Sequence, residues 1–177
     1  MKYSNTQMAA SAQCSEEIAM INRPVLAALC LVFHTASASA LEANVSQETA
    51  LAPAQAWQAI GDFCGIAKWH PEVASCEPSE VMGAKLRRIK FKDGGTMREQ
   101  LVEQNAETME QKSLMLDGTL PVRNYQATLK VVPTATGAAY TWSGVFETNG
   151  ASEDEAVQSL TRFYTAGIGG LVQQGKK

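Results

Sequence analysis

The feature that most constrains the fold is a series of short alternating segments, joined by tight turns, between Val73 and Glu147. Alternation of apolar and polar residues predicts strands, and the Gly, Asp and Pro residues between the segments predict turns. Because short turns join antiparallel neighbours, the segments predict an antiparallel sheet. The expected strands are Glu42–Leu51, Val73–Glu77, Lys85–Lys92, Thr96–Glu103, Met109–Leu116, Val122–Val132 and Ala139–Glu147.

One long helix is predicted after the last strand. Ser152 and Glu155 have the spacing of a capping box, which starts a helix. An antiparallel sheet with one apolar face needs a cover, and this helix is the only element long enough to provide it, so the fold class is α+β. Its apolar stripe consists of Leu160, Phe163, Tyr164, Gly167 and Leu171.

Glycines inside this helix predict a close contact or a bend. Gly167, Gly169 and Gly170 each destabilise a helix by roughly 1 kcal/mol relative to alanine. Such a cost is tolerated where the helix must approach a neighbour closely.

Two short helices are expected after the first strand. Pro53 suits the first position of a helix, and Ala56, Trp57, Ile60 and Phe63 follow at helical spacing. A second helix is predicted over Ile66–His70, and Pro71 ends it.

Residues 1–40 have the order of a leader with a secretory signal peptide. Arg23 precedes the apolar run Val25–Phe33, and small residues at 36–40 follow it. We expect cleavage after Ala40 and a start of translation at Met20. The folded domain would then cover residues 41–177. The run is shorter than the roughly 20 residues that span a bilayer, so we expect an exported, periplasmic protein with no stable membrane insertion. An uncleaved anchor is the alternative.

Charge and side-chain counts argue against several kinds of partner. The net charge is −3 and no basic stripe is present, so nucleic acid is not an expected partner. After cleavage the chain keeps one histidine, His70, and two cysteines, Cys64 and Cys76. We therefore expect no metal site and no cofactor. An exported protein can form a disulfide, but two separate buried thiols are the favoured interpretation.

The hairpin around Asp93–Gly95 places two charged residues on its apolar face. The turn predicts that position 91 faces 97, 89 faces 99 and 87 faces 101, which leaves Arg87 and Glu99 diagonally across the strand pair. An inward charge needs a partner, a ligand or water. Two interpretations stay open: a half-solvated ion pair near the sheet edge, or a pair that lines a cavity and orients a ligand. The apolar residues of this face are Ile89, Phe91, Met97 and Leu101.

Several stretches, in this order and spacing, resemble the SRPBCC superfamily, which includes polyketide cyclase/dehydrase-like proteins, START domains, the birch-pollen allergen group and plant abscisic-acid receptors. The resemblance covers residues 42–174. It is carried by Ala56–Phe63, Ala67–Pro71, Gly95–Leu101, Leu120–Tyr125 and the C-terminal helix.

The resemblance implies a helix-grip fold. About seven strands would curve around the long C-terminal helix, with an apolar cavity between them and two short helices closing one end. Cavities of this kind are mostly apolar, with a few placed polar groups. The predicted ligand-contacting residues are Trp69, His70, Arg87, Ile89, Phe91, Met97, Glu99, Leu101, Met115, Tyr125, Leu129, Phe163 and Gly167. Trp57, Trp69 and Trp142 suit core packing as well as ligand stacking.

Single positions can be compared with the abscisic-acid receptors. His70 stands where those receptors carry a lysine that meets a ligand carboxylate. Glu99 matches an inward acidic residue, and Tyr125 matches a pocket tyrosine. Leu120 and Pro121 replace the histidine and arginine of the receptors' latch, so the hormone switch is not expected here.

Three functions from different classes remain open. The first is binding or carriage of a small hydrophobic or amphipathic molecule, oriented by Glu99, Tyr125 and His70. The second is a cyclase, dehydratase or hydrolase acting on a polyketide-like or aromatic substrate, with His70 and Glu99 as general base and acid. The third is an accessory protein that docks on a partner enzyme through an exposed apolar patch. Because the sequence shows no nucleophile–base arrangement and no phosphate loop, we favour binding over catalysis.

Overall fold

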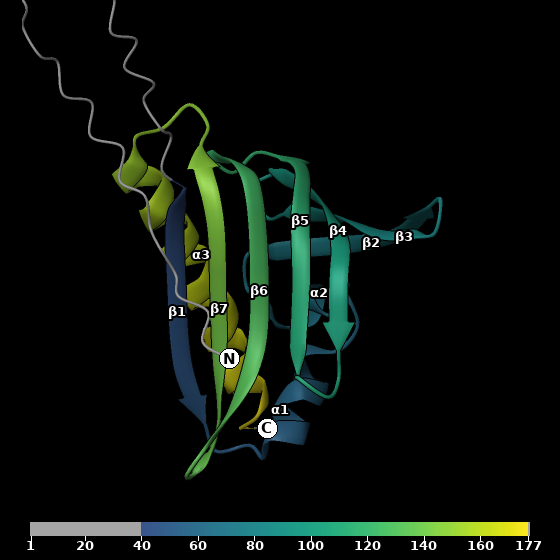
Figure 1. Ribbon diagram of the computed structural model, residues 1–177, viewed down its shortest axis with the longest axis vertical. Helices are drawn as coiled ribbons and strands as arrows, with labels where there is room; N and C mark the ends of the chain where they lie inside the picture. The colour runs from purple at the N-terminus through teal and green to yellow at the C-terminus, as the bar shows by residue number, and fades with distance from the viewer. Residues whose placement is uncertain (1–39, 177) are drawn as a thin grey trace, which may run out of the picture. The chain divides into compact units, whose positions relative to one another are not determined.

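The computed structural model describes residues 40–176 (Figure 1). The predicted signal peptide, the start at Met20 and the alternative of an uncleaved anchor therefore lie, apart from Ala40, outside the described residues. Within the described residues, none of the helices has the length and apolar character needed to cross a membrane.

Seven antiparallel strands form one sheet in the order β1-β7-β6-β5-β4-β3-β2. In Figure 1, β2 and β3 cross β6 and β7 at a steep angle, so the sheet bends around α3. Register shifts in β2, β4 and β6 contribute to this bend, since an extra residue in one strand kinks it. The strands are β1 (Leu41–Thr49), β2 (Val73–Val81), β3 (Ala84–Phe91), β4 (Thr96–Asn105), β5 (Glu110–Gly118), β6 (Val122–Thr134) and β7 (Gly137–Thr148).

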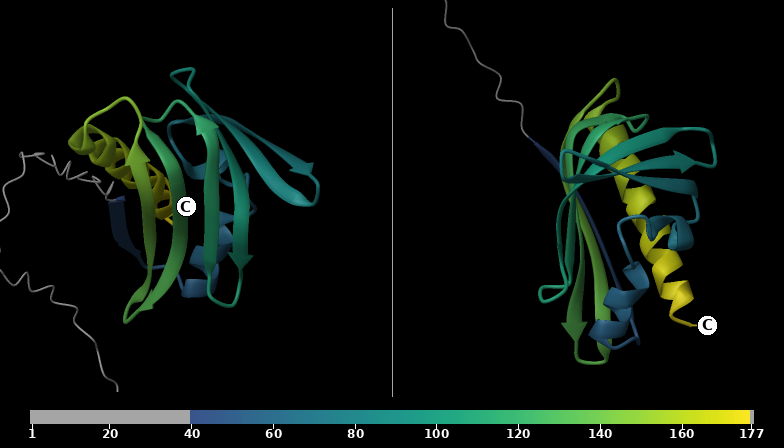
Figure 2. Two further views of the ribbon diagram at one scale, coloured as in Figure 1. Left: turned by 45° about the horizontal axis from the view of Figure 1, so that its top comes forward. Right: turned by 90° about the vertical axis from the view of Figure 1, so that its right-hand side faces the viewer.

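The helices lie on one face of the sheet, as the right-hand view of Figure 2 shows. They are α1 (Pro53–Ile60), α2 (Ile66–Trp69) and α3 (Glu153–Gln174). The capping box of α3 is confirmed, because the Ser152 hydroxyl accepts from the Glu155 amide and the Glu155 carboxylate accepts from the Ser152 amide. The predicted helix-grip fold is therefore confirmed.

Two of the three helical glycines explain how closely α3 approaches its neighbours, α2 at Gly170 and β7 at Gly167. A Cβ atom on Gly170 would lie 1.8 Å from the Trp69 carbonyl oxygen, and one on Gly167 would lie 2.6 Å from the Trp142 ring. Gly169 faces open space, so no contact requires a glycine there.

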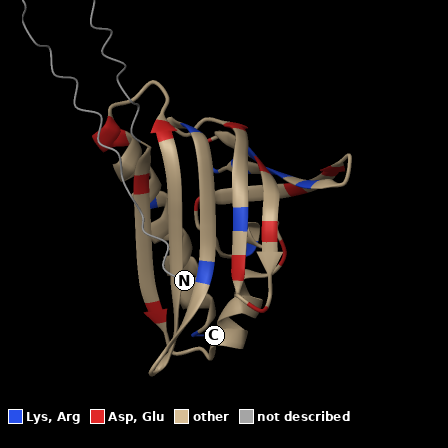
Figure 3. Cartoon of the chain, in the orientation of Figure 1, with Lys and Arg blue, Asp and Glu red and all other residues tan. Residues whose placement is uncertain are grey.

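The strands of the sheet carry charged residues of both signs, as Figure 3 shows. Cross-strand pairs join Arg98 to Asp117 and Arg123 to Glu147. Lys112 lies 2.7 Å from Glu110 and 3.0 Å from Glu103. These contacts are largely solvated, and exposed pairs of this kind contribute little to stability.

The predicted hairpin register is wrong by two residues. Ile89 pairs with Met97 and Arg87 pairs directly with Glu99, instead of Ile89 with Glu99. The turn closes at Phe91, whose amide donates to the Gly95 carbonyl at 2.8 Å. A slip of two residues keeps every side chain on its predicted face, because side chains alternate with a period of two.

The expectation of two separate thiols is also wrong. Cys64 and Cys76 form a disulfide that ties the loop between α1 and α2 to β2, with the two Cα atoms 5.5 Å apart. The chain brings these residues together by turning back at Pro71, after α2. Their sequence separation of 12 carries no sign of this contact.

Candidate functional site

A surface depression of about 540 Å³ opens between the β3–β4 turn, the segment after β5 and α3. We call it the mouth. Its apolar side chains include Phe91 and Phe163, and its rim includes Leu120 and Pro121. The residues that line it are Pro71, Glu72, Phe91, Lys92, Asp93, Thr119, Leu120, Pro121, Ser159 and Phe163.

Phe163 is at the centre of an aromatic cluster beneath the mouth. Its ring stacks on His70 with centroids 4.2 Å apart and meets the edge of Phe91 at 5.8 Å. On its inner side the ring lies 5.3 Å from Trp142. Phe163 therefore packs between the mouth and the residues of the interior.

His70 is buried, with 2% of its surface exposed, and both ring nitrogens have partners. Nε2 lies 3.0 Å from the Phe163 carbonyl oxygen and donates to it, since a carbonyl only accepts. Nδ1 accepts from the Glu72 amide at 3.2 Å. Burial lowers the pKa of His70 from 6.5 to about 4; the hydrogen bond to Phe163 opposes this shift, and the positive charge of Arg87 adds to it. The ring is neutral and structural, so neither nitrogen is free to act as a general base.

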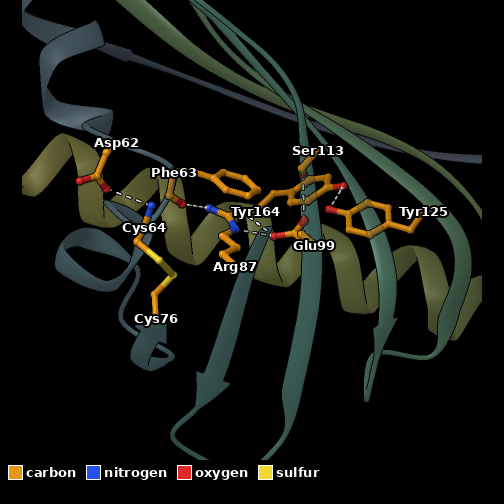
Figure 4. Close-up of polar contacts among 9 residues, drawn as sticks. All are labelled: Asp62, Phe63, Cys64, Cys76, Arg87, Glu99, Ser113, Tyr125 and Tyr164. Carbon is orange, nitrogen blue, oxygen red and sulfur yellow. Dashed lines mark hydrogen bonds and ion pairs between the residues drawn. A yellow bond between two sulfur atoms is a disulfide. The ribbon is translucent and has the colours of Figure 1, made fainter. Parts of the chain in front are cut away.

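Arg87 and Glu99 form a buried ion pair with side chains 5% and 2% exposed. Arg87 Nε donates to Glu99 Oε2 at 2.7 Å, and Nη2 lies 2.6 Å from the same oxygen. Nη1 donates to the Phe63 carbonyl, and the guanidinium lies 4.1 Å from the Phe63 ring centroid. The Ser113 hydroxyl donates to Glu99 Oε1 at 2.8 Å. Figure 4 shows this network, which satisfies both carboxylate oxygens and excludes the half-solvated alternative.

Tyr125 and Tyr164 form a hydrogen bond through their hydroxyl groups beside this network (Figure 4). The Tyr164 hydroxyl donates to Tyr125 Oη at 2.7 Å. Burial raises the pKa of Tyr125 well above 10, and the nearby Tyr164 and Glu99 add to the shift. The pair depends on Gly144, because a Cβ there would lie 2.2 Å from Tyr164 Oη.

The enclosed hollow expected between the sheet and α3 is nearly filled. Within residues 40–176, the space found there measures about 10 Å³, and we call it the inner cavity. The close approach of α3 at Gly167 and the packing of Trp142 against Phe163 and Tyr164 account for the difference. The inner cavity is lined by Trp69, Arg87, Gln111, Ser113, Ala127, Leu129 and Trp142.

Twelve of the thirteen predicted site residues divide among three places. Phe91 and Phe163 line the mouth, whereas Trp69, Arg87 and Leu129 line the inner cavity. Met115 packs, partly buried, against the core. The buried core or network holds His70, Ile89, Met97, Glu99, Tyr125 and Gly167.

The placement of Leu101 in the ligand pocket is wrong. It is half-buried and lines a separate depression of about 490 Å³ with Phe63 and Leu86. The β4–β5 register shifts between Leu101 and Glu103, directly after this position.

Sequence reasoning missed Gln111, Ser113, Ala127 and Trp142 as lining residues of the inner cavity. Gln111, Ser113 and Met115 alternate along β5, so they share one face. Extending the hairpin argument from β4 to β5 would have placed Gln111 and Ser113 inward.

Comparison with known proteins agrees with this geometry. The family described as "Polyketide cyclase / dehydrase and lipid transport" matches residues 40–175. None of the curated proteins matches the chain.

Solved structures share the fold. Protein XoxI from Bacillus cereus is 27% identical, with a TM-score of 0.71 over 77% of this chain and 96% of its own. A protein from Bacillus thuringiensis is 26% identical, with a TM-score of 0.71 over 77% of this chain and 100% of its own. The Zhui aromatase/cyclase from Streptomyces sp. R1128 is 15% identical over 78% of this chain and 93% of its own, with a TM-score of 0.63, a likeness that concerns the fold alone.

The resemblance to the SRPBCC superfamily is thus confirmed, and this chain belongs to its family of polyketide cyclase / dehydrase and lipid transport proteins.

Proposed function

We propose that this protein binds a small, largely apolar ligand that enters at the mouth. The observation that carries the proposal is the mouth itself, about 540 Å³ in volume, with Phe91 and Phe163 among its lining residues. Phe163 packs between this depression and Trp142, which lines the inner cavity. A ligand that displaces the Phe163 ring would reach from one space into the other.

Apolar contact would supply the binding free energy. Each Å² of apolar surface removed from water contributes about 25 cal/mol, before the cost of association. Turning the Phe163 ring gives up its contacts with His70 and Phe91, so we expect moderate affinity and a preference for ligands that replace those contacts. A flat aromatic ring system fits this requirement.

Binding accounts for the site better than acid–base catalysis. A general base or acid needs a free proton position within reach of the substrate. Both nitrogens of His70 and both oxygens of Glu99 are already hydrogen-bonded inside the protein. We therefore propose that these two residues hold the structure around the site in place and do not transfer protons.

We also propose that the protein works outside the cytoplasm. The Cys64–Cys76 disulfide supports this proposal, because such bonds persist in oxidising compartments. The order of charged, apolar and small residues at 23–40 supports it independently. Detection of the chain starting near Leu41 in the periplasmic fraction of its host would test this.

A block at the mouth tests the binding proposal. Ser159 lines the mouth from α3, whereas its neighbour Gln158 is exposed on the same helix. We expect Ser159→Trp to weaken binding of the fluorescent probe 1-anilinonaphthalene-8-sulfonate about tenfold or more, equivalent to roughly 1.4 kcal/mol. Gln158→Trp should leave the affinity unchanged. Equal affinity in both variants, each with an unaltered melting temperature, would exclude the mouth as the binding site.

A further inference from the structure

Gln111 is the polar side chain of the inner cavity with unused hydrogen-bonding capacity. It lies on β5 with 6% of its surface exposed, and it lines the inner cavity. Its Nε2 atom has no hydrogen-bond partner within residues 40–176. A buried amide without a partner is costly, and such groups are rare in folded proteins.

The other polar groups around the inner cavity are already occupied. The three nitrogens of Arg87 contact Glu99 and the Phe63 carbonyl. The Ser113 hydroxyl gives its proton to Glu99. Each nitrogen of the Arg87 guanidinium thus has an acceptor, which leaves Gln111 Nε2 as the buried donor of the cavity lining without one among the described residues. An incoming group that accepts a hydrogen bond suits this donor.

The size of the inner cavity limits that group to a single atom. A space of about 10 Å³ holds about one water-sized probe. The remaining lining is apolar, from Trp69, Leu129 and Trp142 among others. These surroundings fit one oxygen at the tip of an otherwise apolar molecule.

We infer that the ligand carries a hydrogen-bond acceptor oxygen, of the ketone type, at its inner end, and that Gln111 selects for it by donating from Nε2. The inference rests on the proposed binding function and adds the chemical class of the ligand. Gln111 is a specificity-determining residue, whereas Phe91 and Phe163 supply apolar contact that does not distinguish a ketone from a hydrocarbon.

A matched pair of ligands tests the inference. 1-Tetralone and tetralin share the same bicyclic skeleton and differ by one carbonyl oxygen. We expect the wild-type protein to bind 1-tetralone about tenfold more tightly than tetralin, because one buried hydrogen bond is gained. Gln111→Met keeps the length of the side chain and removes the donor, so the preference should fall to about onefold or twofold.

The control is Gln126→Met on the neighbouring strand β6, where the glutamine is exposed. It should keep the wild-type preference. Gln111→Leu provides a second variant with the same expected loss, and circular dichroism confirms that each variant folds. Dissociation constants are measured by equilibrium dialysis.

The outcomes separate the two claims. Binding of both ligands with the same ratio in the wild-type and Gln111→Met proteins would overturn the role of Gln111 and leave the binding proposal standing. Equal affinity of the wild-type protein for both ligands would do the same, and would mark the inner cavity as a site for water alone. Failure of both ligands to bind the wild-type protein would overturn the binding proposal and the inference together.

Discussion

Arg87 is held by three contacts that a shorter or neutral side chain cannot replace. Its guanidinium joins Glu99, the carbonyl of Phe63 and the Phe63 ring within a buried space. The register of β3 and β4, which pairs Arg87 with Glu99, makes this network possible. A single buried charge left without its partner is strongly unfavourable.

We expect Arg87→Met to lower the free energy of unfolding by about 3–5 kcal/mol, because Glu99 then stays buried without its counter-charge. The double variant Arg87→Met/Glu99→Leu should recover most of this loss. Urea unfolding measures both. Arg98→Met, which breaks the exposed pair with Asp117, is the control and should have little effect. A double variant less stable than the single one would show that the ion pair itself stabilises the fold.

His70 gives the stability a predictable pH dependence. Its pKa is about 4 in the folded protein and 6.5 for the free side chain, so the unfolded chain binds the proton more tightly. Stability from this group is therefore fully present above pH 6.5 and is lost as the pH falls towards 4. The shift corresponds to about 3 kcal/mol. Urea unfolding at pH 7 and pH 5 should show the loss in the wild-type protein, and His70→Asn should show much less. An equal loss in both would assign it to other groups.

At the scale of elements, the contact between α3 and α2 depends on which helical glycine faces it. A Cβ at Gly170 would meet the Trp69 carbonyl oxygen at 1.8 Å, whereas Gly169 has nothing within 4 Å. We therefore expect Gly169→Ala to raise the free energy of unfolding by up to about 1 kcal/mol, from helix propensity alone. Gly170→Ala should lower it, because α3 must move away from α2. Thermal unfolding of the two variants tests this, and a gain in both would mean that the helices do not touch at Gly170.

The disulfide fixes the position of the loop that contains Phe63, whose carbonyl accepts a hydrogen bond from Arg87. Cys64 directly follows Phe63, and its bond to Cys76 anchors the loop on β2. Closing a loop of this length stabilises a protein by about 3 kcal/mol in the chain-entropy view. We expect Cys64→Ser/Cys76→Ser to lose about this much in urea unfolding. Dithiothreitol should destabilise the wild-type protein to the same level and leave the double variant unchanged; a wild-type protein insensitive to the reductant would contradict the prediction.

At the scale of the whole molecule, the sequence was sufficient for the architecture. Strand alternation, turn residues and the capping box at Ser152 are local signals, and local signals determined the order of the elements. The inward placement of Arg87 and Glu99 was also predicted, because side chains alternate along a strand and every second residue lies on the same face of the sheet.

The features that the sequence did not predict depend on contacts between residues that are far apart along the chain. The Cys64–Cys76 bond joins two elements whose approach no periodicity reports. The inner cavity measures only about 10 Å³ because Gly167 lets Trp142 and His70 pack close to α3. Sequence periodicity does not report how closely two elements pack. Leu101 was misplaced because alternation predicts the face of β4 on which a side chain lies and not which depression it lines.

The central claim is that a small apolar ligand passes Phe163 and reaches the interior. The most direct test is the set of nuclear Overhauser contacts between 1-tetralone and the protein in solution. We predict contacts to the ring of Phe163 in the mouth together with contacts to the ring of Trp142 beside the inner cavity. Contacts confined to exposed side chains, with none to either ring at saturating ligand, would contradict the account.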